Sequence, residues 1–465
     1  MLFSSISFLY YFLPLTIILY FLSPRYLKNV MLLLSSILFY AWGEPRYVFL
    51  MGGSILTSYG FGIGIEKYRG KGSGKVFCVL AVILSLAALL YFKYADFFLI
   101  NWNRATGQNI PLLHVALPIG ISFYTFQIIS YIIDVYRGEA AQKNIIHLAT
   151  YIAMFPQLIA GPIVRYSDIA GQLKERRHAW GMAAEGIRRF IIGLGKKVLL
   201  ANQLGELCSV FRASEEKSVL FYWLYALAFA LQIYFDFSGY SDMAIGLGKI
   251  FGFHFSENFR YPYISASITE FWRRWHISLG SWFRDYVYIP LGGNRVNRKR
   301  HLWNIFLVWA LTGFWHGAAW NFIAWGLFFA ILLAMEKFWL GKWLEKSRIL
   351  SHSYVLFLVM ISFMIFNAQN MGQAFSDIGG LFGAGGIPLA SGEALYCLRS
   401  FGAVFLISIV GATPVIRQII DRISKRPAGR RMVNGMEPIV LGVLLLMITA
   451  YLVDGSFNPF LYFRF

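Results

Sequence analysis

Long apolar segments alternate with short polar connections along the whole chain. A bilayer span takes about 20 predominantly apolar residues, so segments of this kind predict helices that cross a membrane. The segments are Phe8–Leu22, Asn29–Trp42, Tyr47–Ile65, Val76–Phe92, Leu117–Tyr136, Ile145–Val164, Val219–Phe235, Leu302–Met335, Tyr354–Phe366, Phe401–Val410 and Pro438–Leu452. The pattern predicts an all-α, polytopic integral membrane protein.

Two of these segments cannot be straight helices. Ile145–Val164 contains Pro156 and Pro162, and proline interrupts a helix. Leu302–Met335 contains no Asp, Glu, Lys or Arg, and as one helix it would be about 50 Å long at about 1.5 Å per residue. Because the bilayer core is about 30 Å thick, we expect this run to break, most naturally at Gly313–Gly317.

The composition excludes an ordinary soluble protein. Hydrophobic residues make up 58% of the 465 residues and charged residues 14%, whereas soluble domains carry about 25% charged residues. The net charge is +19, and the basic surplus in short connections such as residues 67–75 predicts that these face the cytoplasm. The nearly neutral connections Asn101–His114 and Gln369–Ser400 are then expected outside. No nucleic-acid-binding motif accompanies the charge, so nucleic acid is not an expected partner.

His316 is the one ionisable residue in the run Leu302–Met335. A helix between it and the basic connection that ends at His301 would place it about 22 Å from the cytoplasmic side. A neutral imidazole at this depth keeps one donor and one acceptor nitrogen and can act as a general base. The alternative is a packing role, because Gly313 and Gly317 would let two helices approach closely. An ionisable residue inside the membrane favours the functional interpretation.

Arginines and tryptophans surround His276 in the stretch Phe271–Tyr286. Arginines flanked by aromatic rings would suit the phosphates of a nucleotide-like or phosphopantetheine donor. Anchoring at the membrane interface would explain the same composition equally well. Asp236 directly follows the apolar segment Val219–Phe235. A carboxylate there must either pair with a cation, for which a nearby arginine is the expected partner, or line a site.

Several catalytic signatures are absent from the sequence. It has no phosphate-binding loop of the form G-x-x-x-x-G-K-[ST], no G-x-S-x-G and no H-E-x-x-H. The cysteines Cys78, Cys208 and Cys397 are far apart. We therefore expect neither a disulfide framework nor a metal site.

Five segments, in order along the chain, resemble the membrane-bound O-acyltransferase superfamily. The resemblance is to its bacterial cell-envelope branch, which O-acetylates exopolysaccharides such as alginate, or peptidoglycan. The segments are Leu117–Gln127, Phe155–Pro162, Asp236–Asp242, Phe271–His276 and Thr312–Trp320. The further stretch Tyr288–Arg295 favours the acetylating branch over the branch that transfers D-alanine to teichoic acid.

The resemblance implies a fold, a domain plan and site residues. It implies one membrane domain over residues 1–465, with N-terminal helices at 1–110, a catalytic core at 111–340 and C-terminal helices at 341–465. About 11–13 transmembrane and re-entrant helices would form a ring around a thinned central tunnel. His316 matches the superfamily's catalytic histidine, and His276 matches the second histidine of the branch. Further candidates for lining the donor site or tunnel are Asp236, Trp272, Arg273, Arg274, Trp275, Trp315 and Asn321.

The resemblance also implies an activity and its partners. The expected protein is an O-acyltransferase of the inner (cytoplasmic) membrane that passes an acetyl group from acetyl-CoA or a carrier-protein thioester to an extracytoplasmic acceptor. No permanently bound cofactor is expected. The expected partners are an extracytoplasmic SGNH-hydrolase-like acetyltransferase and the polysaccharide secretion machinery. The alternatives are D-alanyl or other acyl transfer to teichoic acid and, from a different class, a transporter without chemistry of its own.

Overall fold

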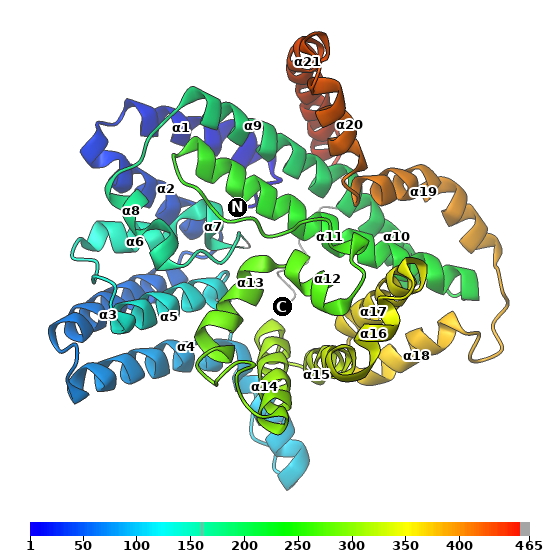
Figure 1. The fold of residues 1–465 in the computed structure, drawn as a ribbon, viewed down its shortest axis with the longest axis horizontal. Helices are drawn as coiled ribbons and strands as arrows, with labels where there is room; N and C mark the ends of the chain where they lie inside the picture. The colour runs from blue at the N-terminus through cyan, green and yellow to red at the C-terminus, as the bar shows by residue number, and fades with distance from the viewer. Residues whose placement is uncertain (160, 456–465) are drawn as a thin grey trace. The chain divides into compact units, whose positions relative to one another are not determined.

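The computed structural model describes residues 1–159 and 161–455, and these residues form helices and no β-strand (Figure 1). The predicted all-α architecture is confirmed. The α-helices are α1 (Leu13–Leu22), α2 (Lys28–Gly43), α3 (Tyr47–Lys67), α4 (Gly72–Thr106), α5 (Ile121–Arg137), α6 (Ile145–Ala153), α7 (Phe155–Leu158), α8 (Tyr166–Lys174), α9 (Trp180–Gly195), α10 (Asn202–Ala213), α11 (Val219–Ile250), α12 (Ile268–Arg274), α13 (Ile277–Phe283), α14 (Arg298–His316), α15 (Trp320–Met335), α16 (Gly341–Leu344), α17 (Arg348–Asn367), α18 (Met371–Leu381), α19 (Gly392–Gly411), α20 (Val415–Ser424) and α21 (Pro427–Val453). Short π or 3₁₀ turns are η1 (Phe8–Phe12), η2 (Arg25–Leu27), η3 (Lys196–Ala201), η4 (Pro262–Ile264), η5 (Arg284–Tyr288) and η6 (Glu336–Leu340).

Among the described residues, seven helices are long and apolar enough to cross a membrane. They are α3, α4, α11, α17, α19, α21 and the continuous helix Trp320–Leu344 that contains α15. The first predicted segment, Phe8–Leu22, is also a continuous apolar helix, although a shorter one. The chain is therefore a multi-pass membrane protein. The ring of helices around a tunnel stays a prediction.

The chain folds into two compact units. One comprises residues 1–190 and 243–256, and the other comprises residues 191–242 and 257–465. His276 and His316 both belong to the second unit, so the geometry around each can be described within one body. The division of the chain at residues 110 and 340 stays a prediction.

Two predicted connections are partly helical, which corrects the sequence analysis. α4 continues to Thr106 and ends at Gly107, whose φ is +71°, so only the second half of Asn101–His114 is a loop. Gln369–Ser400 contains α18 and the start of α19. These two helices begin where the side chains of Asn370 and Ser391 accept hydrogen bonds from backbone N–H groups one turn later. Apolar length alone did not show these ends, because polar caps set them.

Both predicted breaks in the long apolar segments are confirmed. In the first unit, α6 ends at Ala153 and α7 begins at Phe155, with Pro156 in its first turn. Ala160 of the predicted segment Phe155–Pro162 lies outside the described residues. In the second unit, the chain leaves the helix after His316 and resumes it at Trp320.

α14 and α15 lie side by side (Figure 1), and they pack against each other at glycines. A Cβ atom added at Gly313 would collide with the backbone oxygen of Phe322, and one added at Gly326 would collide with that of Trp309. The backbones can therefore approach closely only because these positions carry no side chain. The close helix packing predicted at Gly313 is confirmed. It holds the C-terminal turn of α14, which carries His316, against α15.

Candidate active site

The start of α12 is fixed by two side chains. The Ser267 hydroxyl caps the helix by accepting a hydrogen bond from the backbone N–H of Glu270, at 3.0 Å. The buried carboxylate of Glu336 accepts hydrogen bonds from the backbone N–H groups of Ile268 and Thr269 and from the Thr269 hydroxyl, at 2.5, 3.0 and 2.9 Å. A negative charge at a helix N-terminus is stabilised by the helix dipole. The segment that leads to His276 is thus held in place at its origin.

His276 occupies the junction between α12 and α13, two seven-residue helices that are too short to span a membrane. Its backbone φ of +43° is in the left-handed region, and its side chain is almost fully buried. The Nδ1 atom lies 3.1 Å from Oδ1 of Asn258, and the ring packs edge-on against Phe237 with centroids 4.6 Å apart. Burial lowers the pKa of His276, so the imidazole is neutral at physiological pH.

A cavity of about 550 Å³ lies beside His276 within the second unit. Its lining includes the exposed residues Arg273 and Arg284 and the buried residues His276 and Thr312. The cavity therefore leads from the surface of the unit to its interior. Aromatic walls are supplied by Trp272 and Trp309, whose ring centroids are 4.6 Å apart.

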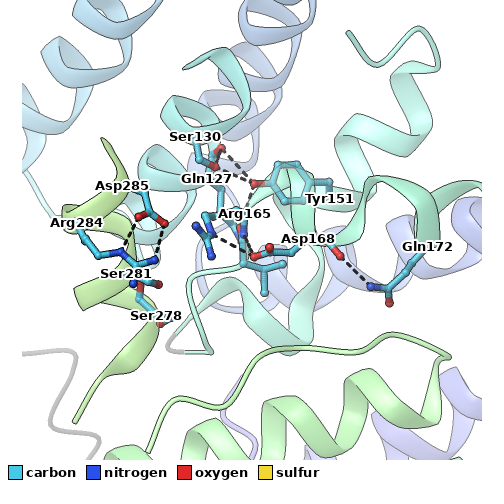
Figure 2. A network of polar contacts seen from close by, with 11 residues as sticks. Gln127, Ser130, Tyr151, Arg165, Asp168, Gln172, Ser278, Ser281, Arg284 and Asp285 are labelled. Atoms are coloured by element: carbon cyan, nitrogen blue, oxygen red, sulfur yellow. Dashed lines mark hydrogen bonds and ion pairs between the residues drawn. The ribbon is translucent and has the colours of Figure 1, made fainter. Parts of the chain in front are cut away.

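The lining of this cavity is rich in cations. Arg273 has no ion-pair partner among the described residues, whereas Arg284 pairs with Asp285 at 2.7 Å. Figure 2 shows Arg284 and Asp285 close to Ser278 and Ser281. Arg273 is therefore the arginine of this cavity whose charge is available to an anionic ligand.

Lys337 and His301 lie on the same wall of the cavity. Lys337 Nζ is 3.4 Å from Nε2 of His301, and the Tyr288 hydroxyl is 3.0 Å from the same nitrogen. Burial, followed by the charge of Lys337, lowers the pKa of His301, so this imidazole is neutral beside the ammonium group. This wall therefore adds one positive charge to the cavity, from Lys337, and none from His301.

His316 is the last residue of α14 and is enclosed by aromatic rings. The ring centroids of Trp315, Trp325 and Phe366 lie 4.9, 5.0 and 5.3 Å from that of His316. The side chain is 6% exposed and does not line the described cavity. Thr312, one turn earlier on the same face of α14, does line it. His316 therefore continues the helix face that borders the cavity, one turn further along.

The ring of Trp315 lies next to both histidines. Trp315 lies 4.9 Å from His316 and 6.3 Å from His276, measured between ring centroids. Of the other candidates for the donor site, Trp272 and Arg273 line the cavity beside His276. The structure thus brings these five predicted site residues into one region.

The remaining candidates do not line the cavity. Asp236 forms an ion pair with Lys197 at 2.6 Å, so its cation is a lysine rather than the expected arginine. Arg274 pairs with Glu270 at 2.7 Å. The side chain of Trp275 packs among aromatic rings such as Phe271 and Phe259. The side-chain amide of Asn321 donates to the backbone oxygens at the C-terminal end of α17, the shortest contact being 2.9 Å to Ala368.

Sequence reasoning missed the residues that hold His276. Asn258 lies 18 positions before it in an irregular segment, and Glu336 lies 60 positions after it. No local spacing connects these residues to His276, because their contacts exist only in the folded chain. Within the described residues, no group of three or more His, Cys, Asp or Glu side chains is placed to hold a metal ion.

Comparison with known proteins agrees with this arrangement. Residues 80–371 match the membrane-bound O-acyltransferase family. The chain is 39% identical to a probable alginate O-acetylase of Azotobacter vinelandii over the full length of both proteins. It is 32% identical to a peptidoglycan O-acetyltransferase of Helicobacter pylori, over all of this chain and 98% of that protein. A teichoic acid D-alanyltransferase of Bacillus subtilis is 31% identical over 66% of this chain and 81% of its own length.

The family match extends over more than half of the chain and contains both histidines, the cavity and the break after α14. The two full-length relatives are both named for O-acetylation. The resemblance seen in the five sequence segments is confirmed. The chain belongs to the membrane-bound O-acyltransferase family, and it is an O-acyltransferase.

Proposed function

We propose that this protein moves an acetyl group from a cytosolic thioester, across the inner membrane, to an acceptor hydroxyl on the extracytoplasmic side. The product would be an O-acetylated exopolysaccharide such as alginate, or an O-acetylated cell-wall glycan. Two relatives that match the whole chain support this choice of reaction, since one is named an alginate O-acetylase and the other a peptidoglycan O-acetyltransferase.

The observation that carries the proposal is the cation-lined cavity that runs from Arg273 to His276. Acetyl-CoA and acyl carrier proteins both present an acyl thioester on a flexible phosphopantetheine arm. An unpaired guanidinium suits the phosphate of that arm, and the aromatic and apolar walls suit its neutral part. The basic connection Arg295–His301 is placed in the cytoplasm by the charge rule, and its last residue, His301, lines the cavity. A donor made in the cytosol would enter from this side.

In this mechanism His316 is the general base. It accepts the proton of the acceptor hydroxyl while the hydroxyl oxygen attacks the thioester carbonyl, so a C–O bond forms and the C–S bond breaks. The departing thiolate then takes the proton, which restores the neutral imidazole. A positioned base of this kind contributes about 10²- to 10⁴-fold to a rate. His276, which lines the cavity, would contact the reacting end of the donor.

The membrane makes positioning especially valuable in this reaction. A charged carrier cannot cross hydrocarbon, so the donor and an external acceptor would otherwise never meet. An enzyme that admits only the acyl group and its neutral arm would hold the donor and the acceptor hydroxyl next to each other. The resulting gain in effective molarity is large. The acceptor would be an extracytoplasmic acetyltransferase of the SGNH-hydrolase type, which esterifies the polysaccharide during its secretion.

The test is acetyl transfer by protein reconstituted in vesicles and supplied with radiolabelled acetyl-CoA and a glycan or protein acceptor. His316→Ala is expected to abolish transfer while the variant still elutes as folded protein. His352 provides a matched control, because its ring contacts the backbone oxygens of Arg348 and Ile264 and it does not line the cavity. His352→Ala should transfer acetyl at close to the wild-type rate. Retained transfer by His316→Ala would refute its assignment as the base.

A second candidate is D-alanyl transfer, which the 31% identical teichoic acid D-alanyltransferase favours. Acetyl and D-alanyl thioesters supplied in parallel would separate the two activities, since only the true donor should lose its label to an acceptor. The transporter alternative predicts movement of a solute across sealed vesicles with no turnover of any thioester.

A further inference from the structure

The backbone at His276 is strained. Among the described residues, only three non-glycine residues have a positive φ, and His276 is the one of these that is buried, with φ +43° and ψ +53°. Such a conformation costs about 1–3 kcal/mol and persists only when the surrounding structure enforces it. The groups that enforce it here come from one short segment, residues 258–260.

This segment clamps His276 from both sides. The backbone N–H of Arg260 donates to the carbonyl of Arg274 at 2.9 Å, and the backbone N–H of Ile277 donates to the carbonyl of Asn258 at 3.0 Å. Asn258 is fully buried, and its side-chain oxygen accepts hydrogen bonds from the backbone N–H and the hydroxyl of Ser278, at 3.2 and 2.9 Å. The residues that precede and follow His276 are therefore tied to the same segment.

The same amide oxygen also fixes the proton on the imidazole ring. A backbone N–H can only donate, so the Asn258 atom that faces the backbone of Ser278 is its oxygen and not its nitrogen. An amide oxygen can only accept, so Nδ1 of His276, 3.1 Å away, must carry the hydrogen in this contact. The neutral ring then has its lone pair on Nε2, and this nitrogen is buried and has no hydrogen-bond partner in the described part of the chain.

We infer that Asn258 is a positioning residue that holds His276 as the Nδ1–H tautomer, so that His276 acts through Nε2 as a hydrogen-bond acceptor. This inference rests on the proposed function and sharpens it. A lone pair cannot polarise a thioester carbonyl, because that requires a donor hydrogen. His276 instead receives a hydrogen bond from an N–H or O–H group of the substrates, such as an amide of the phosphopantetheine arm or the acceptor hydroxyl.

The surroundings of His276 supply no competing carboxylate among the residues that the structure describes. The rings packed against it belong to Phe237, Phe259 and Trp315, which do not titrate. The charged or titratable groups that share its cavity are Arg273, Arg284, Tyr288, His301 and Lys337. Arg284 is itself neutralised by Asp285. Burial lowers the pKa of His276, which agrees with a neutral acceptor at this position.

A first experiment reads the tautomer directly in the wild-type protein and does not depend on activity. Protein labelled with ¹⁵N only in histidine is compared with its His276→Gln variant, so that the signals of His276 are identified by difference. The expected spectrum shows a protonated Nδ1 and an unprotonated Nε2. A protonated Nε2 at neutral pH would overturn the inference. If no thioester supports acyl transfer, the proposed function fails while this measurement still decides the tautomer.

A second experiment compares two replacements of Asn258 in the transfer assay. Asn258→Leu removes the acceptor and is expected to lower kcat about 10- to 100-fold, the size of effect known for partners that orient metal-bound histidines. Asn258→Asp keeps an acceptor oxygen but adds a carboxylate, which raises the pKa of His276. Below that pKa, Nε2 is protonated and cannot accept, so the acid limb of kcat/KM should move to higher pH while activity recovers in alkaline buffer.

The matched control is Asn304, another buried asparagine of the same unit. Its amide donates to the backbone oxygens of Leu291 and Gly293, at 3.3 and 3.0 Å, and it does not line the cavity. Asn304→Leu and Asn304→Asp should lower thermal stability and leave the pH profile of the remaining activity unshifted. Equal losses in Asn258→Leu and Asn258→Asp, with no shift of the acid limb, would show that Asn258 is merely structural and would overturn the inference.

Discussion

Two polar sites in the second unit are buried to the same degree and are built differently. Asp236 and Lys197 are 1% and 2% exposed and neutralise each other across 2.6 Å. His276 and Asn258 are 1% and 0% exposed, yet Nε2 of His276 has no hydrogen-bond partner among the described residues, and His276 lines a cavity of about 550 Å³. Burial alone therefore does not identify a reactive group. What distinguishes His276 is a ring nitrogen without a hydrogen-bond partner in the chain as described, in a residue that lines a cavity.

Backbone strain also distinguishes His276 from Asp236. α11 carries Asp236 as an ordinary helical residue within Val219–Ile250. His276 has a left-handed backbone that two short helices and residues 258–260 hold in place. Local strain of this kind is found at functional sites, where the surrounding structure compensates for it. The Asp236–Lys197 ion pair stabilises the fold. The hydrogen bonds from residues 258–260 instead hold His276 in a strained backbone conformation.

The largest expected effect is on catalysis and comes from the strained site. His276→Gln should reduce acetyl transfer about 10²- to 10⁴-fold, since it removes the ring that we propose contacts the reacting groups. Its midpoint of thermal unfolding should change by only a few degrees, because the backbone clamp does not involve the imidazole. Radiolabel transfer and thermal unfolding of the same preparation measure both effects. If the variant unfolds instead, His276 stabilises the fold, as Asp236 does.

The ion pair should show the opposite balance. Asp236→Ala leaves the Lys197 ammonium buried without its carboxylate, and breaking a buried pair in this way costs about 3–5 kcal/mol. Thermal unfolding in detergent should therefore shift to markedly lower temperature. The double variant Asp236→Leu with Lys197→Met removes both charges and should recover most of that stability. Failure of the double variant to recover would mean that Asp236 serves more than this ion pair.

A smaller effect is expected where α14 packs against α15. Gly326→Ala places a methyl group against the backbone oxygen of Trp309, and overpacking of this kind costs about 1–3 kcal/mol. Trp309 also forms part of the cavity wall, so stability and acetyl transfer should fall together. Gly53 offers a control, because a Cβ atom there meets nothing within 4 Å. Gly53→Ala should leave unfolding nearly unchanged.

The smallest effect separates two adjacent arginines. Arg273→Gln should raise KM for the thioester donor about fivefold, equivalent to about 1 kcal/mol for an exposed charge, and leave kcat unchanged. Arg274, which is occupied by Glu270 and does not line the cavity, is the control. Arg274→Gln should leave KM unchanged. A KM that responds equally to both substitutions would argue against a phosphate contact at Arg273.

Most of the helices could be predicted because apolar length is a local signal. The first apolar segments, such as Tyr47–Ile65, lie within single helices. The run Leu302–Met335 breaks after His316, within the predicted stretch Gly313–Gly317. The signal failed where polar residues are helical, as in residues 101–106 and in α18. Caps and side-chain contacts determine those elements. One such contact is the ion pair in which the Arg212 guanidinium donates to the Asp377 carboxylate of α18 at 2.6 Å, and a hydropathy pattern does not show it.

The sequence by itself determined that this protein crosses the membrane repeatedly, that its family is the membrane-bound O-acyltransferases, and that His276 and His316 are the histidines to examine. These features depend on composition and on the order of short segments, which a linear chain displays. Only the tertiary structure decided that Asp236 pairs with Lys197, that Arg273 rather than Arg274 borders the cavity, and that Asn258 faces Nδ1 of His276. Those outcomes depend on distances between residues remote in sequence, and folding alone creates them.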